Sequence, residues 1–308
     1  MTGRFYIDDK DAYSEFGIFI AEGGYNELLS YAPLKAVESN DWPEEDGQEF
    51  DLSAPALDTR ELVLKFAAHR VLRVGAFVEL LSDHAYHTFD FRSIGRTYKL
   101  RLASQSALNL AGQLETFSLK FDNDFPLPDN YTYTEPQSDL VAQSGYELDA
   151  RSLAEYGVCI LKGSDAEIQK SPAVKKNLLQ NLKGQHGAIY DDQVVTFQTK
   201  DVKLNCLMRA KTLSEFWRNY DALLYDLIRP GERLLYVEKT GNIYPCFYKS
   251  CSTIQFHPTG RIWFQFSLTL TFTTFHVKGV VQEYFLASEE SAYLITEDEL
   301  KVVIFKNN

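Results

Sequence analysis

The chain has 308 residues, more than the roughly 100–200 residues of a usual single domain, so two domains are expected. Hydrophobic residues make up 45% and charged residues 24% of the chain, which excludes a wholly disordered protein. The 31 basic and 43 acidic residues leave a net charge of −12, which argues against specific or tight nucleic-acid binding. An aromatic share of 14% favours strands and sheet-based interfaces over helical bundles.

The start of the chain and its hydropathy bear on location. The run from Met1 to Asp9 turns acidic before any apolar stretch, so no signal peptide is expected and the chain stays in the cytoplasm where it is made. No run approaches the ~18 apolar residues that span a bilayer, which argues against membrane insertion. Cys159, Cys206, Cys246 and Cys251 are expected to be buried, reduced thiols.

Residues 1–121 are predicted to form a first strand-rich domain. Gly23-Gly24 indicates a turn, because no dinucleotide or Walker pattern surrounds it. Glu38 to Asp51 is an acidic run of the kind that usually forms a solvated loop. Apolar and polar residues then alternate from Leu62 to Phe66, as in a strand with one buried face, and a weaker helical pattern follows from Leu72 to Ser82.

A polar, proline-containing linker is predicted at 122–145, before a second strand-rich domain at 146–275. In this second domain, apolar residues from Thr212 to Ile228 recur at steps of three and four and predict a helix. Its apolar face, which includes Trp217, is expected to pack onto the sheet of the same domain. Thr212 and Glu215 form a capping box at its start, and Pro230-Gly231 ends it. The alternation from Phe264 to Phe272 predicts a strand.

Residues 276–308 are predicted to be a short C-terminal β extension. Three strand-like runs occur in it, at Val280–Phe285, Ala292–Ile295 and Lys301–Phe305. They are too few for an independent domain, so we expect them to dock on a β domain or on a neighbouring chain.

An internal repeat organises the chain. Matching residues recur 140 positions apart in three separated blocks, with slightly larger offsets later, as small loop insertions produce. The first block pairs Tyr6, Asp9, Glu15, Phe16, Gly17, Ile18 and Ile20 with Tyr146, Asp149, Glu155, Tyr156, Gly157, Val158 and Ile160. Later matches pair Glu27, Leu28, Lys35 and Thr59–Leu62 with Glu167, Ile168, Lys175 and Thr199–Val202. The two predicted domains are therefore read as diverged copies of one fold.

Four segments carry a resemblance to a known family: Tyr13–Ile18, Glu38–Gly47, Thr59–Phe66 and Ala188–Asp192. This order of an acidic-aromatic-glycine turn, a long loop and strands resembles the tail-tube-like domain of bacteriophage distal tail proteins. Its duplication resembles the baseplate hub proteins of contractile-tailed phages. The resemblance implies a mainly β fold of two tandem tail-tube-like barrel or sandwich domains, each with one packed helix. It covers roughly residues 5–275.

The functional implications of this resemblance concern assembly. It implies a structural, non-catalytic, ring-forming component of a phage or prophage-derived tail, located in the virion, without cofactors or active-site residues to carry over. Six tube-like domains commonly close such a ring, so three chains with pseudo-six-fold symmetry are expected, a hexamer being the alternative. The expected partners are further copies of the chain and other tail or baseplate proteins. No carbohydrate-binding domain follows the two copies, which leaves receptor binding open.

Loops of opposite charge are the candidate contacts between domains or subunits. Complementary potentials fix pairing and register, so an acidic loop of one copy and a basic loop of the other would suit neighbouring positions in a ring. The candidate residues are Glu38, Asp41, Trp42, Glu44, Glu45 and Asp46 in copy one and Lys170, Lys175, Lys176 and Lys183 in copy two.

The sequence gives little support for a metal site or a catalytic residue. His84 and His87 have a spacing that suits a metal, but copy two has no matching pair and a solvated connector is the simpler reading. Cys246 and Cys251 lack a second ligand pair at zinc-site spacing, so we expect no metal site. No cysteine is paired with a base in a nucleophile pattern, and no catalytic residue is expected.

Two other function classes stay open at this point. A tandem β-sandwich that binds carbohydrate or protein would use exposed aromatic side chains, for which Trp42, Tyr131 and Tyr133 are the candidates. A hydrolase built on the acidic loop, with Glu45 as a test residue, is the more distant reading.

Overall fold

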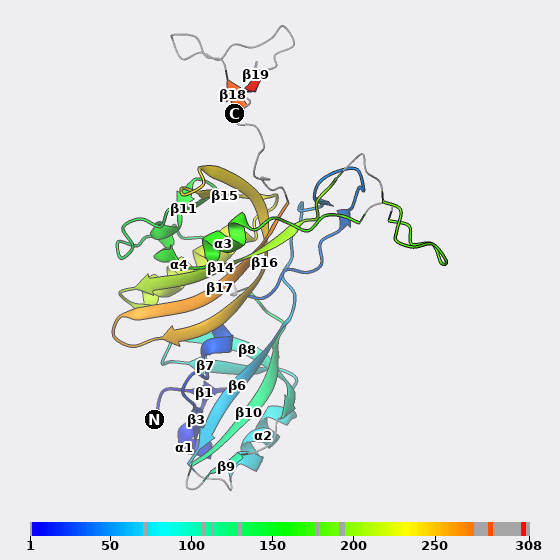
Figure 1. Cartoon of the computed structure of the whole chain (residues 1–308). Helices are drawn as coiled ribbons and strands as arrows, with labels where there is room; N and C mark the ends of the chain where they lie inside the picture. Colours follow the sequence, from blue (N-terminus) through cyan, green and yellow to red (C-terminus); the bar gives the residue numbers. More distant parts are fainter. Residues whose placement is uncertain are drawn as a thin grey trace. The chain divides into compact units, whose positions relative to one another are not determined.

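The chain folds mainly into β-strands, as the alternating sequence pattern predicts (Figure 1). The computed structural model describes residues 2–69, 73–105, 109–111, 114–127, 131–176, 179–190, 195–273, 283–285 and 303–305. Residues Met1–Thr274 form one compact unit and Phe275–Asn308 a second. The first unit contains two large sheets, and we use module one for residues 2–127 and module two for residues 131–273.

Module one is a curled sheet with a helix against one face. Its strands are β1 (Tyr6–Ile7), β2 (Lys10–Asp11), β3 (Ile18–Ile20), β6 (Arg60–Ala68), β7 (His87–Phe91), β8 (Arg96–Gln105), β9 (Asn109–Ala111) and β10 (Leu114–Asn123). Its helices are α1 (Ala12–Phe16), the 3₁₀ turn η1 (Asn26–Leu29) and α2 (Val74–Asp83). The sheet order is β2-β1-β7-β8-β10-β6-β3, with β9 beside β10. A separate small hairpin joins β4 (Ser39–Asn40) and β5 (Glu49–Phe50).

Module two repeats this arrangement with longer strands. Its strands are β11 (Tyr146–Leu148), β12 (Arg151–Ser152), β13 (Val158–Ile160), β14 (Lys200–Ala210), β15 (Arg233–Val237), β16 (Asn242–His257) and β17 (Ile262–Phe272). Its helices are η3 (Leu153–Tyr156), α3 (Ser164–Gln169) and α4 (Leu213–Leu227). The sheet order is β12-β11-β15-β16-β17-β14-β13, which is the order of module one when the strands are matched along the chain.

A local turn also recurs in the two modules, although it pairs Asp149 with Asp8 and so lies one residue away from the sequence match of Asp149 with Asp9. Asp8 in module one and Asp149 in module two both have a left-handed backbone, with φ of 47° and 51°. Each carboxylate accepts a hydrogen bond from the neighbouring strand of its sheet. Asp8 accepts from the amide of Thr88 in β7, and Asp149 accepts from the amide of Leu234 in β15, both at 2.8 Å. An aspartate tolerates this backbone because its short side chain bonds locally.

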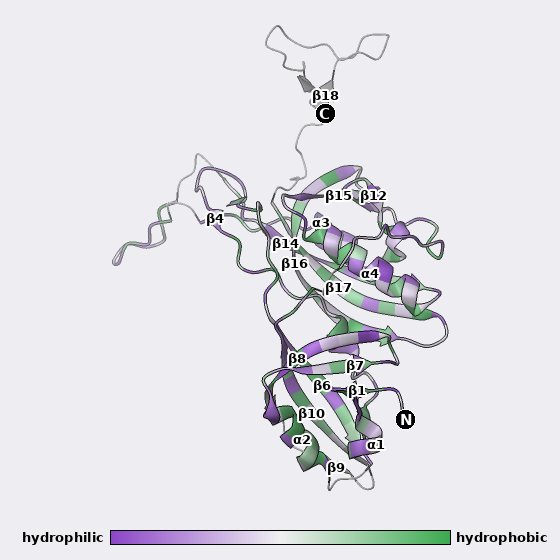
Figure 2. Cartoon of the chain, turned by 180° about the vertical axis from the view of Figure 1, so that it is seen from behind, coloured by the Kyte–Doolittle hydropathy of each residue, from purple (hydrophilic) through white to green (hydrophobic). Residues whose placement is uncertain are grey.

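The cores lie between each sheet and its helix. In module one, Phe77 of α2 packs against Phe66 and Phe117, with ring centroids 5.5 and 6.2 Å apart. In module two, Phe216 of α4 packs against Phe256 and Phe264 at 5.1 and 5.8 Å. Full burial of each such ring is worth about 1.5–3 kcal/mol. The strands alternate in hydropathy, as Figure 2 shows, because only one face of each sheet meets the helix.

The predicted helix of the second copy is confirmed as α4, and the weaker one as α2. The Thr212 hydroxyl accepts from the Glu215 amide at 3.1 Å, and the Glu215 carboxylate accepts from the amide of Lys211 at 3.0 Å. These bonds satisfy amides that have no partner within the helix.

The element boundaries refine the sequence expectation. Strand β10 continues to Asn123, so the first two residues of the predicted linker belong to the sheet. The division into two domains with a linker and an extension stays a prediction. In the second unit, β18 (Glu283–Phe285) pairs antiparallel with β19 (Val303–Phe305). The predicted run Ala292–Ile295 lies outside the described residues.

Candidate functional site

The contact between the two modules is the most developed site that the structure describes. Helix α4 of module two reaches the turn before β8 of module one. The indole Nε1 of Trp217 donates to the carbonyl of Ile94 at 2.6 Å, and the guanidinium of Arg96 lies 4.5 Å from the Trp217 ring centroid. The same guanidinium makes two hydrogen bonds to the carboxylate of Asp221, at 2.7 and 2.8 Å. A paired, bidentate ion contact therefore fixes the orientation of α4 against module one.

The environment of this ion pair is mostly buried. The side chains of Arg96 and Asp221 are 20% and 11% exposed. Burial raises the pKa of the Asp221 carboxyl, and the hydrogen bonds and charge of Arg96 oppose that rise. Burial alone would lower the pKa of Arg96, but Asp221 raises it above its ordinary value. Each charge is thus tolerated in the junction because the other is present.

Buried tyrosines cross the junction in both directions. The Tyr31 hydroxyl of module one donates to the carbonyl of Tyr220 at 2.8 Å, and the Tyr220 hydroxyl donates to the carbonyl of Leu29 at 2.8 Å. Tyr248 of β16 donates to the carbonyl of Ala32 at 2.8 Å. Burial raises the pKa of all three phenols, so they stay neutral donors. Each buried hydroxyl has a backbone acceptor, as a stable interface requires.

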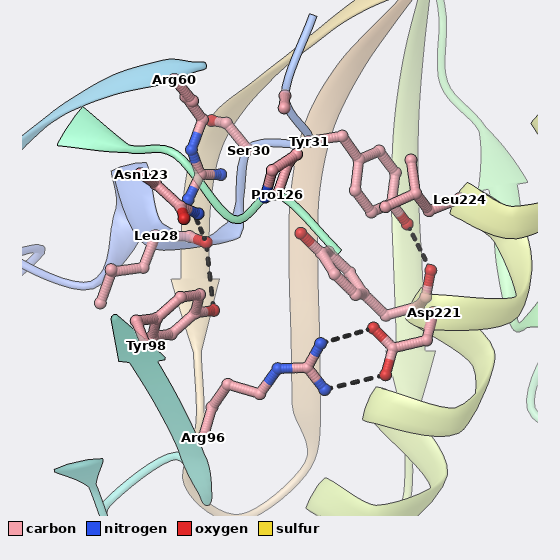
Figure 3. Close-up of a pocket in the computed structure, with 12 residues that line it drawn as sticks. Leu28, Ser30, Tyr31, Arg60, Arg96, Tyr98, Asn123, Pro126, Asp221 and Leu224 are labelled. Atoms are coloured by element: carbon pink, nitrogen blue, oxygen red, sulfur yellow. Dashed lines mark hydrogen bonds and ion pairs between the residues drawn. The ribbon is translucent and has the colours of Figure 1, made fainter. Parts of the chain in front are cut away.

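A small cavity lies within the junction (Figure 3). Its volume is about 30 Å³, about the room that one water molecule takes. Arg60 and Tyr98 both point at the carbonyl of Leu28, each at 3.2 Å, on the side opposite the Arg96–Asp221 pair. The cavity is too small for a substrate, so this part of the junction holds the modules together.

Two long hairpins extend from corresponding points of the modules. We call residues 33–58 arm 1 and the described residues 173–176, 179–190 and 195–198 arm 2. Arm 1 contacts the base of arm 2 in the same chain, where the Lys175 ammonium lies 2.5 Å from the Asp41 carboxylate and 2.8 Å from the carbonyl of Trp42. Lys175 is only 5% exposed, and its hydrogen bond holds the pKa of Asp41 below the usual value. This lysine is therefore the buried anchor of arm 1.

The tip of arm 1 approaches module two closely. Asp46 accepts from the amide of Phe197 at 2.8 Å, and Gly47 donates its amide to the carbonyl of the same residue at 2.8 Å. Gly47 has φ of 74°, and a Cβ placed on it would lie 2.5 Å from the carbonyl oxygen of Thr273. Only glycine fits this position, because both the backbone and the close approach exclude a side chain.

The predicted contact residues divide into two sets. Asp41, Trp42, Asp46 and Lys175 meet across the two modules within one chain. The others are exposed and make no salt bridge among the described residues; they are Glu38, Glu44, Glu45, Lys170, Lys176 and Lys183. The carbonyl of Lys170 accepts from the buried ammonium of Lys200. Whether any of the predicted residues joins separate chains stays a prediction.

Three aromatic residues behave differently from expectation. The prediction that Trp217 packs onto its own sheet is wrong, since its indole contacts module one. Tyr131 and Tyr133 are expected to be exposed, but both are half-buried against Tyr225 of α4, with ring centroids 5.8 and 5.0 Å apart. Burial raises the pKa of each to about 12. Of the three candidate sugar-stacking residues, Trp42 is exposed, at 52%.

The expectation that both histidines lie in a solvated connector is wrong for His87. His87 is buried, and its Nδ1 lies 2.5 Å from the Asp8 carboxylate. His84 stacks on it at 6.1 Å. Among the described residues, no group of three or more His, Cys, Asp or Glu side chains has the geometry to hold a metal.

The four cysteines are free thiols. Burial raises the pKa of Cys206 and Cys246, the two that are fully buried. The expectation of buried thiols is confirmed for these two, whereas Cys159 and Cys251 are half-buried. The raised pKa values of the buried thiols make them poor nucleophiles.

Sequence reasoning missed the main junction residues. Arg96 and Asp221 are 125 positions apart, and nothing in their local sequence pairs them. Tyr31 and Tyr248 carry no pattern that separates a junction tyrosine from a core tyrosine. Within the described part of the chain, no helix has the length and apolar character to cross a membrane.

Comparisons with known proteins give weak likenesses. No protein-family model matches the chain, and no curated protein matches it. Among solved structures, it is similar to the SPP1 Dit (gp 19.1) protein, described as a paradigm of the hub adsorption apparatus in phages that infect Gram-positive bacteria. That alignment covers 87% of this chain and 97% of the other, with a TM-score of 0.32 and 12% identity. The PlzA protein of Borreliella burgdorferi, solved with c-di-GMP, aligns over 85% and 89%, with a TM-score of 0.17 and 10% identity.

Proposed function

We propose that this protein is a structural, non-catalytic ring component of a bacteriophage or prophage-derived tail, at the distal tail or baseplate hub. The main observation behind the proposal is the contact between module one and module two. Two modules of the same strand order touch through different surfaces. Module one contributes the region of η1, arm 1 and the start of β8, and module two contributes α4 and the middle of β16. Such a head-to-tail contact can be repeated from chain to chain.

In a single chain, each module keeps a free surface that could make the same kind of contact with another chain. Module one retains α2, the counterpart of α4, and the part of β8 beyond Arg96 and Tyr98, the counterpart of the corresponding part of β16. Module two retains α3 and the part of arm 2 beyond its base at Lys175 and Phe197, the counterparts of η1 and the outer part of arm 1. Heterologous contacts of this kind close into a ring when the rotation allows it and otherwise extend into a helix. Three chains would supply six modules, in a ring with approximate six-fold and true three-fold symmetry.

The assignment to a phage tail rests on the sequence resemblance, and the matching strand order supports the duplication it requires. A ring through which a genome passes should not hold nucleic acid tightly, and the net charge of −12 suits that role. The partners would be copies of the chain above all, then other tail or baseplate proteins.

The size and shape of the assembled particle test the proposal. Light scattering over a concentration series should give three chains per particle, and negative-stain images should show a ring with six similar lobes. Labelling with an antibody should place the protein at the tip of tails in a lysate that contains the particles. A chain that stays monomeric at every concentration, and binds a glycan or a protein as a monomer, would instead support the binding-module reading.

A further inference from the structure

We infer that arm 2 is the segment that docks on a second copy of the chain, in a seat on the outward face of module one around Glu61, Arg101 and Asp122. This inference rests on the proposed ring function and specifies the contact that would close it. The structure contains a template for the contact, because arm 1 already occupies the corresponding seat on module two.

The two arms are the same hairpin. An isolated bridge pairs Leu34 with Leu57 at the base of arm 1, and another pairs Val174 with Phe197 at the base of arm 2. Farther out, Asn40 pairs with Glu49, and Gln180 pairs with Ile189. All four positions differ by 140 residues between the arms, so length and register are equal. A glycine with a left-handed backbone follows at the matching tip position, with φ of 74° at Gly47 and 83° at Gly187.

Arm 1 is seated along its length on module two. The amide of Leu34 donates to the carbonyl of Lys249 at 2.9 Å. The ring of Phe50 packs against that of Phe247, with centroids 4.8 Å apart. Gly47 lies against the backbone of Thr273 so closely that a Cβ does not fit. The seat is therefore made by the outward side of β16, the end of β17 and the base of arm 2 at Lys175 and Phe197.

Arm 2 has no such seat among the described residues. A Cβ placed on Gly187 would have no atom within 4 Å, although its φ is positive like that of Gly47. Tyr190 stands where arm 1 has Phe50, and it is 36% exposed. The other large apolar side chains of arm 2 that are exposed are Val174, Leu179, Leu182, Ile189 and Val195. So many exposed apolar side chains on one hairpin indicate a surface that is covered in an assembly.

Strand register locates the corresponding seat on module one. In module two, Asp201, Thr271 and Phe247 are cross-strand neighbours on β14, β17 and β16. In module one, the same row of β6, β10 and β8 contains Glu61, Asp122 and Arg101. The side chains of Glu61 and Arg101 are 58% and 39% exposed, so this row is open to a partner.

The chemistry of this row suits arm 2. Tyr190 would meet the guanidinium of Arg101 where Phe50 meets Phe247, and an arginine over a tyrosine face is a favourable cation–π contact. The carboxylates of Asp122 and Asp124 already hold Arg101 in place at 2.9 and 3.0 Å. The Glu61 carboxylate of this row is paired with Lys120 at 2.9 Å, so the contact that arm 2 gains here is with the Arg101 guanidinium rather than with a free carboxylate. The occupant that the geometry selects is therefore a second copy of this chain.

Cysteine cross-linking of the full chain tests the contact directly. The single variants Tyr190→Cys and Arg101→Cys are mixed in equal amounts, oxidised mildly and resolved without reductant. A covalent pair of chains is expected from the mixture and not from either variant alone or from the unaltered chain. A Tyr190→Cys, Arg101→Cys double variant should form covalent species of two and three chains and none larger. Lys65→Cys, farther along β6, replaces Arg101→Cys as the matched control and should give no pair.

The intramolecular seat supplies a positive control. A Phe50→Cys, Phe247→Cys double variant should form its disulfide within one chain, with loss of free thiol and no gain in mass. Pairing of Tyr190→Cys chains with each other alone would indicate an arm-to-arm contact and overturn the proposed seat.

A pair of glycine variants tests the same contact without new thiols. Gly187→Asn adds a side chain at the position equivalent to Gly47, and Gly184→Asn adds the same side chain at a neighbouring glycine with φ of 98° and nothing within 4 Å. Both positions have a positive φ, so each asparagine adds backbone strain in an exposed turn, and the melting temperatures of the two variants are compared with that of the unaltered chain. Gly187→Asn should weaken assembly about tenfold, or about 1.4 kcal/mol, and Gly184→Asn should not.

The outcomes separate this inference from the function on which it rests. Rings that form normally, without the cross-link and without an effect of Gly187→Asn, would refute the arm 2 seat and leave the ring proposal standing. An unaltered chain that never assembles would remove both.

Discussion

The ion pair between Arg96 and Asp221 should contribute measurably to the stability of residues 1–274. The perturbation is Asp221→Asn, which keeps the shape of the side chain and removes its charge. The companion variant is Arg96→Met, which keeps the apolar stem that lies over Trp217. Because the pair joins module one to module two, the change in the free energy of unfolding measures how much this contact between the modules stabilises the chain.

The expected magnitude follows from the burial of the pair. Breaking a buried ion pair by removing one partner costs about 3–5 kcal/mol, because the remaining charge is left without compensation. Arg96 is 20% exposed, so water can partly solvate the charge that Asp221→Asn leaves behind. We therefore expect the free energy of unfolding to fall by about 2–3 kcal/mol for either single variant. The double variant should lose little more, with a coupling free energy of about 1–3 kcal/mol.

Guanidinium denaturation of the four proteins, followed by tryptophan fluorescence and circular dichroism, measures this cycle. The exposed pair Lys211–Asp139, with side chains 55% and 73% exposed, serves as the control cycle and should show no measurable coupling. A coupling free energy below about 0.5 kcal/mol for Arg96 and Asp221 would contradict the reasoning, since that is the range of exposed pairs.

Three further predictions concern single residues. Trp217→Phe removes the hydrogen bond to the carbonyl of Ile94 and should lower the free energy of unfolding by about 1–3 kcal/mol, measured in the same denaturation assay. Lys175→Met should release arm 1, seen as faster hydrogen exchange and proteolysis at 38–51, and unchanged exchange there would count against the anchor role. Burial lowers the pKa of Lys200 to about 8, so the unfolded chain holds this proton more tightly. Stability should then rise with pH between about 8 and 10, and Lys200→Met should flatten that rise in pH-dependent melts.

The sequence alone determined the elements that depend on local pattern. The helical spacing and the capping box located α4 within a residue at each end, because both signals act over a few neighbouring residues. The alternation in β6 and β17 located those strands for the same reason. The constant offset of 140 residues also identifies counterparts such as Lys35 and Lys175 from residue identities alone, since insertions shift register only where loops change length.

Tertiary structure decided which partner each buried face meets. Periodicity shows that Trp217 lies on an apolar side of α4, but the helix is buried on two sides, and one side meets module one rather than its own sheet. Among the lysines of the basic loop, only the fold brings Lys175 to Asp41 and leaves Lys176 exposed. The difference between a seated arm 1 and an exposed arm 2 is also invisible in sequence. The hairpins are alike, and the seat is made by strands that lie far away in the chain and are brought together only by the sheet.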